Sequence, residues 1–245
     1  MGLVTGGARG IGEAVAIELA ANGADIVVCD IAPPAAASRT IEIIESGGRR
    51  ALYFQGDVGD RSCMEELFAE ADRVFGRLDI LVNNAAINVR KPLVDLEIED
   101  VDKVWSVIMW GAFHCSQLAA RRMIARREGG NIVTISSVHA VRAFPLSTAY
   151  NAAKAAVAHM ARTWAAELAP HRIRVNVVEP GWIDTPGERS FYTEDQIRES
   201  GQKLPLARLG SPEEIAHAVA YLVSEDAAYV TGSCLRVDGG IVLPH

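Results

Sequence analysis

Tyr150 and Lys154 lie four residues apart in the alanine-rich stretch AYNAAKAAVAH, residues 149–159. Alanine favours helix, and residues four apart share one helix face, so the lysine ammonium can lie beside the tyrosine phenol. A free phenol has a pKa of about 10 and is a poor base near neutrality. A unit charge about 4 Å away, at an effective dielectric constant of about 20, contributes about 4 kcal/mol, which lowers that pKa by about three units. The spacing is compatible with an acid–base pair, but an isolated Tyr/Lys pair on a helix is usually structural, so the rest of the chain must decide between the two interpretations.

A second chemical signal is the glycine-rich stretch TGGARGIG, residues 5–12, which follows an apolar run and begins a helical pattern. Glycines let the backbone approach a pyrophosphate, and the start of a helix offers free N–H groups at its positive end. In the order strand, turn, helix, this stretch predicts a dinucleotide site. The expected contacts in this turn are Gly6, Arg9, Gly10, Ile11 and Gly12.

Asp30 ends the next apolar run, 18 residues after Gly12. A carboxylate at this position accepts hydrogen bonds from ribose hydroxyls and repels a 2′-phosphate, which favours NAD. Arg9 is a cation that could meet such a phosphate, whereas Ile31 supplies no second one. We therefore expect NAD to be preferred and NADP to be accepted as well. The alternative for Asp30 is a turn residue at the end of a strand.

The elements that must position these residues alternate along the chain. Strand-like apolar runs occupy 2–5, 25–31, 51–55, 79–84, 131–136, 174–180 and 234–238, and helical patterns lie near 11–22, 35–46, 61–75, 100–127, 149–168 and 212–224. Alternation of this kind predicts right-handed βαβ units and a parallel sheet. We expect one Rossmann-type α/β domain over 1–245, with a doubly wound sheet of seven strands that binds its ligand at the strands' carboxyl ends. The long mixed insertion at 181–211 predicts a substrate lid.

Composition excludes several classes of function. The chain is 49% hydrophobic with a net charge of −7, which argues against a nucleic-acid or anionic-membrane partner. No apolar run approaches the length of a membrane span, and the start shows no secretory signal. Four cysteines are far apart, so we expect reduced thiols and a cytoplasmic protein. The histidines show no metal-ligand spacing, so we expect no catalytic metal.

Ser137 directly follows the fifth apolar run's last residue, thirteen residues before Tyr150. Together with TGGARGIG, NNAA at 83–86 and PGWIDT at 180–185, this spacing resembles the short-chain dehydrogenase/reductase family along essentially the whole chain. The resemblance implies hydride transfer between NAD(P) and a secondary alcohol or carbonyl. It implies Tyr150 as general base or acid, Ser137 as hydrogen-bond donor to the substrate oxygen, and Lys154 as the residue that lowers the tyrosine's pKa and holds the nicotinamide ribose.

The other expected cofactor contacts follow the third, fourth and sixth strands. Asp57 and Val58 are expected at the adenine, and Asn84 and Ala85 near the adenosine ribose. After the sixth strand, the expected contacts are Pro180, Gly181, Ile183 and Thr185. The resemblance implies that Ile183 lies with its backbone against the carboxamide and that the Thr185 hydroxyl is near the cofactor.

One position departs from the family pattern. The family usually shows V-N-x-x-G-x-F where this chain reads VIMWGAF, residues 107–113, so Ile108 replaces an active-site asparagine. That asparagine helps to hold a water that leads protons from the lysine to solvent, and an isoleucine side chain forms no hydrogen bonds. We expect a functional but slower oxidoreductase. The alternative is an NAD(H)-binding sensor or scaffold with weakened catalysis.

Only a short stretch of the sequence indicates the substrate. SSVH, residues 136–139, resembles glucose 1-dehydrogenase-like members, which favours a sugar or polyol with His139, Arg142 and Trp182 as contacts. His139 is alternatively a loop histidine without a ligand role. A 3-oxoacyl-carrier-protein reductase-like ketoreductase is the nearest enzyme alternative, and Asp30 counts against its usual NADPH.

Two of the expected helices are apolar beyond one face, which usually means burial on a second side. The residues concerned are Trp105, Met109, Trp110, Met123, Met160 and Trp164. The resemblance implies a homotetramer joined through these helices. The alternative is a monomer in which the chain's own packing buries these residues.

Overall fold

The protein's computed structural model describes residues 1–190 and 192–243, and its centre is a parallel sheet of seven strands. The strands are β1 Gly2–Thr5, β2 Ile26–Asp30, β3 Ala51–Gln55, β4 Ile80–Asn83, β5 Gly130–Ile135, β6 Ile173–Pro180 and β7 Cys234–Val237. Their spatial order is β3-β2-β1-β4-β5-β6-β7, and every neighbouring pair is parallel. The predicted fold class is therefore confirmed. The order reverses between β1 and β4, and ligands of open α/β sheets bind at such a switch point.

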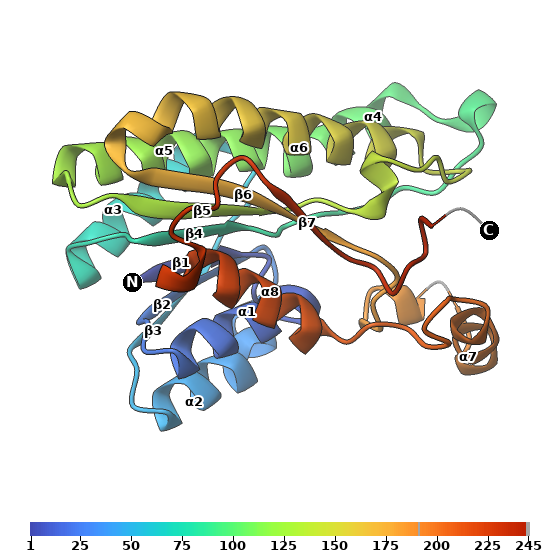
Figure 1. The fold of residues 1–245 in the computed structure, drawn as a ribbon, viewed down its shortest axis with the longest axis horizontal. Coiled ribbons are helices and arrows are strands. Elements are labelled where there is room, and N and C mark those ends of the chain that lie inside the picture. Colours follow the sequence, from blue (N-terminus) through green and yellow to red (C-terminus); the bar gives the residue numbers. More distant parts are fainter. Residues whose placement is uncertain (191, 244–245) are drawn as a thin grey trace.

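Helices cover both faces of the sheet (Figure 1). They are α1 Gly10–Ala21, α2 Ser38–Ser46, α3 Arg61–Phe75, α4 Ile98–Trp105, α5 Gly111–Arg126, α6 Thr148–Leu168, α7 Glu194–Gln202 and α8 Pro212–Val223. Leu3 and Leu81 pack with α3, α5 and α6, whereas the following residues, Val4 and Val82, pack with α1, α2 and α8. Because successive strand residues face opposite ways, continuous Val/Ile/Leu runs suit a sheet that is buried on both faces.

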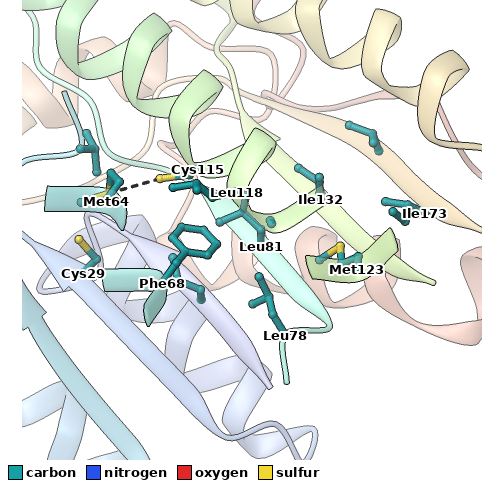
Figure 2. Close-up of a cluster of buried hydrophobic side chains, with 14 of the residues drawn as sticks. Cys29, Met64, Phe68, Leu78, Leu81, Cys115, Leu118, Met123, Ile132 and Ile173 are labelled. Carbon is teal, nitrogen blue, oxygen red and sulfur yellow. Dashed lines mark hydrogen bonds between the residues drawn. The ribbon is translucent and has the colours of Figure 1, made fainter. Parts of the chain in front are cut away.

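The core between the sheet and the α3–α5 layer is made of fully buried apolar side chains. Figure 2 shows Phe68, Met64 and Cys115 in contact there, with the Cys115 Sγ 3.5 Å from the Met64 Sδ. Burial raises the pKa of the Cys115 thiol to about 12, so this cysteine behaves as a small hydrophobic residue. Met123, which the sequence placed among the candidate interface residues, is fully buried in this core instead.

The helix predicted over 100–127 is divided into three parts. α4 ends at Trp105, a π-helical turn spans Ser106–Trp110, and α5 begins at Gly111. A Cβ on Gly111 would lie 2.6 Å from the Val58 side chain, so the chain passes very close to the loop after β3 at this point. π-Helical turns are uncommon and are frequent at functional sites. The turn brings Ile108 into the interior, where it is 3% exposed.

The 181–211 insertion is ordered into short elements. It contains a 3₁₀ turn at Glu188–Ser190 and α7, which begins with a capping box between Thr193 and Gln196. A bridge between Ile183 and Gly210 brings the two ends of the insertion together. Figure 1 shows α7 beyond the carboxyl ends of the strands, away from the helices that cover the sheet. Within the part of the chain that the structure describes, no helix is long and apolar enough to cross a membrane.

Candidate active site

The glycine turn between β1 and α1 has the form that a pyrophosphate requires. Gly6 and Gly10 take positive φ angles of 64° and 60°, and a Cβ on Gly12 would lie 2.1 Å from the Gly6 carbonyl oxygen. Arg9, at the N-cap position of α1, makes no capping hydrogen bond with its side chain. The first N–H groups of α1, which include that of Ile11, therefore remain for an anion at the helix's positive end. These residues fit a dinucleotide cofactor.

Asp30 lies against this turn. Its Oδ2 accepts a hydrogen bond from the Ala8 backbone N–H at 3.0 Å, and its Oδ1 accepts one from the Ala32 N–H at 3.1 Å. These two bonds fix the carboxylate at the end of β2. The alternative interpretation of Asp30, a turn residue at the end of the strand, predicts such bonds as well. Ile31 beside it is 68% exposed, and Arg9 is exposed as well.

The loops after β3 and β4 lie next to the same turn. Asn84 donates its side-chain amide to the carbonyl oxygens of Thr5 and Gly6 at 2.9 and 3.0 Å, and the Ala85 N–H donates to the Thr5 hydroxyl. Asp57 is exposed and accepts from the Gly59 N–H, while Val58 is buried against Gly111. The loop after β4 is thus bonded to the end of β1 at the switch point, and Val58 lines one cavity with Thr5 and Ala85.

The chain after β6 approaches the glycine turn from the other side. A Cβ on Gly10 would lie 3.6 Å from Thr185, and a Cβ on Gly181 would clash with Asp238 at 2.5 Å. Ile183 is buried, and Pro180 is the last residue of β6. Pro180 and the three predicted residues that follow β6 therefore lie at the carboxyl edge, and Thr185 lies within contact distance of the turn.

Ser137, Tyr150 and Lys154 come together beyond the end of β5. Ser137 interacts with Tyr150 closely enough to lower its pKa, and Tyr150 lies in the first turn of α6. The Lys154 Nζ lies 5.5 Å from the centre of the Tyr150 ring and donates to the Ile135 carbonyl oxygen at 2.7 Å. Ser136 donates to the Lys154 carbonyl oxygen at 2.8 Å, which attaches α6 to the end of β5. The helix and the strand thus hold the three side chains in one group.

Burial shifts the pKa values of both members of this pair. Burial raises the pKa of Tyr150 to about 12, and the interaction with Ser137 only partly opposes the rise. Burial also lowers the pKa of Lys154 to about 7. Loss of hydration disfavours both the phenolate and the ammonium. The role of Lys154 in lowering the tyrosine's pKa, which the resemblance implies, stays a prediction. Near neutrality the phenol holds its proton, which suits a general acid.

His139 lies beside Tyr150, edge to face, with 5.1 Å between the ring centres. Its Nδ1 is 2.6 Å from the Asn151 Oδ1, and the Asn151 amide nitrogen donates to the Phe144 carbonyl oxygen at 3.0 Å. That second bond makes the Asn151 oxygen an acceptor, so the His139 Nδ1 is the donor and Nε2 is left as an acceptor. Burial lowers the pKa of His139, so the ring is neutral at pH 7.

The remaining substrate candidates lie in different surroundings. Trp182 donates through Nε1 to the Glu188 carboxylate at 3.2 Å, within the 181–211 insertion. Arg142 is exposed and donates to the Ile241 carbonyl oxygen at 2.5 Å, so it contacts the C-terminal segment. Its role as a substrate contact stays a prediction.

Sequence reasoning missed Arg90, which follows β4. Its NH1 donates to the Tyr192 hydroxyl at 2.8 Å, and its NH2 lies 3.6 Å from the Glu188 carboxylate. The only signal in the sequence was a cation soon after NNAA. Its partners are about a hundred residues away, so no local pattern could indicate them.

Ile108 lies at a small cavity behind Lys154. The cavity has a volume of about 10 Å³ and is lined by Thr5, Asn83, Ile108, Thr134 and Lys154 among others. That volume is at the lower limit for one water, which needs about 10–15 Å³ and two to four polar partners. The Asn83 Oδ1 is buried and has no hydrogen-bond partner among the described residues. The polar atoms here therefore come from Asn83, the threonines and the lysine.

Comparisons with known proteins agree with this geometry. A family model described as enoyl-(acyl carrier protein) reductase matches residues 6–242. The 3-oxoacyl-[acyl-carrier-protein] reductase of Thermotoga maritima is 38% identical over 98% of this chain and 97% of its own length. The chain belongs to the short-chain dehydrogenase/reductase family. Glucose 1-dehydrogenase 2 of Bacillus subtilis is 36% identical, over 98% of this chain and 94% of its own length.

A solved short-chain dehydrogenase/reductase from Mycobacterium marinum superposes with a TM-score of 0.94 at 33% identity, and the match covers 99% of this chain and 95% of that one. As a short-chain dehydrogenase/reductase, the protein is an NAD(P)-dependent oxidoreductase that acts on CH–OH or carbonyl groups. In the described part of the chain, no three His, Cys, Asp or Glu side chains cluster as a metal site would require.

Proposed function

We propose that this enzyme interconverts a secondary hydroxyl of a sugar or polyol with the corresponding carbonyl, and that it prefers NAD to NADP. The observation that carries the proposal is the group formed by Ser137, Tyr150 and Lys154 at the carboxyl edge of the sheet, near the glycine turn. The neutral His139 against Tyr150 adds an acceptor for a substrate hydroxyl.

Each side chain has a defined task in this proposal. The glycine turn, Asp30 and Lys154 hold the cofactor, which accepts or supplies the hydride when bound. Tyr150 donates its proton to the substrate oxygen in reduction. In oxidation only its phenolate form, the minor form near neutrality, receives the proton of the substrate hydroxyl. Ser137 donates a hydrogen bond to the same oxygen and stabilises the charge that develops on it.

The cofactor preference is supported by the fixed carboxylate of Asp30. Two backbone N–H groups hold it against the glycine turn, where it repels a 2′-phosphate. Arg9 is exposed nearby, which is why NADP is not expected to be excluded. A kcat/KM for NADP tenfold above that for NAD would contradict the preference.

A ketoreductase acting on a 3-oxoacyl chain is the second candidate, because a reductase of that name is among the relatives. The similarity to a glucose 1-dehydrogenase supports the sugar instead. The polar His139 beside Tyr150 also favours a substrate with several hydroxyls over an acyl chain.

The test is a turnover assay that follows NADH in the presence of aldoses, alditols, simple secondary alcohols and a 3-oxoacyl thioester. Tyr150→Phe should lower kcat on the best substrate by about 10²–10⁴-fold, because general acid–base catalysis contributes that much. Its Kd for NAD should remain within about twofold of the unmodified protein's. Tight NAD binding without turnover of any substrate would instead favour the hypothesis that the protein is an NAD(H)-binding sensor or scaffold.

A further inference from the structure

Asn83, the last residue of β4, faces the layer that contains α5 and α6. Leu81 packs with those helices, whereas Val82 packs on the other face of the sheet, so Asn83 shares the face of Leu81. The Asn83 amide nitrogen donates to the Ser116 hydroxyl of α5 at 2.9 Å and to the hydroxyl of Thr134, its neighbour on β5, at 3.4 Å. These two bonds fix the orientation of the amide.

The oxygen of the same amide lacks a donor. Asn83 is 6% exposed, and its Oδ1 has no hydrogen-bond partner among the residues that the structure describes. A buried oxygen without a donor is costly, and ordered water usually satisfies the polar groups that the protein's own atoms leave unpaired. Because Asn83 lines the cavity behind Lys154, such a water would lie in that cavity.

The cavity offers enough partners for one water. Thr134 and Lys154 line it together with Asn83, and their hydroxyl and amine carry hydrogens to donate. The Lys154 Nζ donates one hydrogen to the Ile135 carbonyl oxygen and has others. A buried water makes about three hydrogen bonds and needs about 10–15 Å³. The cavity has a volume of about 10 Å³, so one water and no more would fit.

Lys154 has a use for such a water. Burial lowers its pKa to about 7, so near neutrality the amine both holds and releases a proton. Transfer of that proton needs a hydrogen-bonded path, and the side chains of Ile108, Val107 and Val157, which also line the cavity, offer none. A water bonded to the Asn83 oxygen would provide one.

We propose that Asn83 provides the amide that Ile108 lacks, and that its Oδ1 holds a water in this cavity through which Lys154 exchanges protons with solvent. The water takes one proton from the ammonium and passes one of its own onward, so it is regenerated. The same steps run in reverse when the amine is protonated. Asn83 is a positioning residue, because it acts through the water and the lysine. The inference rests on the catalytic role proposed for Lys154, and it holds for any alcohol or carbonyl substrate.

The first test is Asn83→Leu, which replaces the amide with an apolar side chain of similar size. We expect kcat on the best substrate of the turnover assay to fall at least about tenfold, because the water serves an acid–base step that contributes about 10²–10⁴-fold. The KM for that substrate and the Kd for NAD should stay within about twofold, since Asn83 binds neither. The solvent deuterium isotope effect on kcat should rise, because proton transfer becomes the slow step.

A rescue experiment separates this role from a structural one. In Asn83→Leu/Ile108→Asn an amide returns to the cavity from the π-helical turn, and kcat should recover to within about threefold of the unmodified protein's. An amide at position 108 would not repair a loss caused by the missing bonds to Ser116 and Thr134.

Asn131→Leu is the matched control. Asn131, the second residue of β5, also has a buried Oδ1 without a partner in the described part of the chain, and it does not line the cavity. Its replacement should leave kcat and the solvent isotope effect unchanged.

A crystal structure of the unmodified protein with NAD gives a measurement that does not depend on the folding of any variant. It should show one water within about 3.2 Å of both the Asn83 Oδ1 and the Lys154 Nζ. A cavity without water, or an Asn83 oxygen bonded to a protein donor, would overturn the inference.

The kinetic outcomes keep the two claims apart. An unchanged kcat in Asn83→Leu, an equal loss in Asn131→Leu, or no recovery in the double variant would overturn the inference while Tyr150→Phe still shows the proposed function. No NAD-dependent turnover by the unmodified protein would overturn the proposed function, and this inference with it.

Discussion

The chemistry at the residue scale depends on two buried groups whose pKa values shift in opposite directions. Tyr150 rises to about 12 and Lys154 falls to about 7, and burial is the main cause of both shifts. Lys154 is 3% exposed and donates to the Ile135 carbonyl oxygen. A lysine in this state gains or loses its charge near neutral pH, so a small change in its surroundings alters the charge next to the phenol.

The lowered pKa of Lys154 predicts how stability depends on pH. In the unfolded chain the lysine holds its proton up to its ordinary value of 10.5, whereas the folded protein loses it near 7. Between these values the unfolded state binds more protons, so the free energy of unfolding rises with pH. At 1.36 kcal/mol per pH unit, the gain from pH 7 to pH 9 is about 2 kcal/mol.

Lys154→Met should lack this gain, and urea unfolding of both proteins at pH 7 and pH 9 measures it. Contributions of Tyr150 and the cysteines cancel in the difference between the two proteins, because both retain these groups. Parallel pH dependence in the variant and the unmodified protein would show that Lys154 keeps an ordinary pKa.

At the scale of elements, the π-helical turn Ser106–Trp110 decides what lies behind Lys154. It directs Ile108 into an apolar cluster with Val104, Ala153 and Val157. The cavity at Lys154 is therefore bordered by an aliphatic side chain where the family usually has an amide.

Ile108→Asn should have two opposite effects. An amide at the cavity adds hydrogen-bonding atoms next to Lys154, so we expect kcat to rise if proton transfer through this region limits turnover. Burying the amide in the apolar cluster should lower the free energy of unfolding by about 1–3 kcal/mol. Steady-state kinetics and urea unfolding measure these effects, with Ile108→Val as the apolar control. A folded Ile108→Asn with an unchanged or lower kcat would exclude a limiting role for the missing amide.

For the whole molecule, the remaining prediction concerns assembly. Trp105, the last residue of α4, is 37% exposed. Trp110, the last residue of the π-helical turn, is 56% exposed. Large apolar side chains in such exposed positions indicate contact with another chain. Met123 no longer contributes to this argument, because it is buried in the chain's own core.

We expect a homotetramer, so light scattering at micromolar concentration should report a mass near four times 26.3 kDa. Trp110→Glu should reduce that mass, because it places a charge in an apolar contact. Trp110→Phe, which keeps an apolar ring, should not. A mass near 26.3 kDa for the unmodified protein would establish the monomer.

The sequence by itself determined the parts of this protein that depend on short spacings. The glycine turn, the strand ends and the four-residue step from Tyr150 to Lys154 are all local, so periodicity and residue type were sufficient to predict the parallel sheet. The roles of Tyr150 and Lys154 came from the resemblance to the family. Ser137 could be included because it follows a strand whose carboxyl end had to lie at the same edge.

Only the tertiary structure decided the rest. The π-helical turn lies where the following Gly111 approaches Val58, and the hydrogen bond from Arg90 to Tyr192 joins residues 102 positions apart. The pKa shifts depend on how much water the folded chain removes from Tyr150 and Lys154. These properties come from long-range packing and desolvation, which no local pattern of residues encodes.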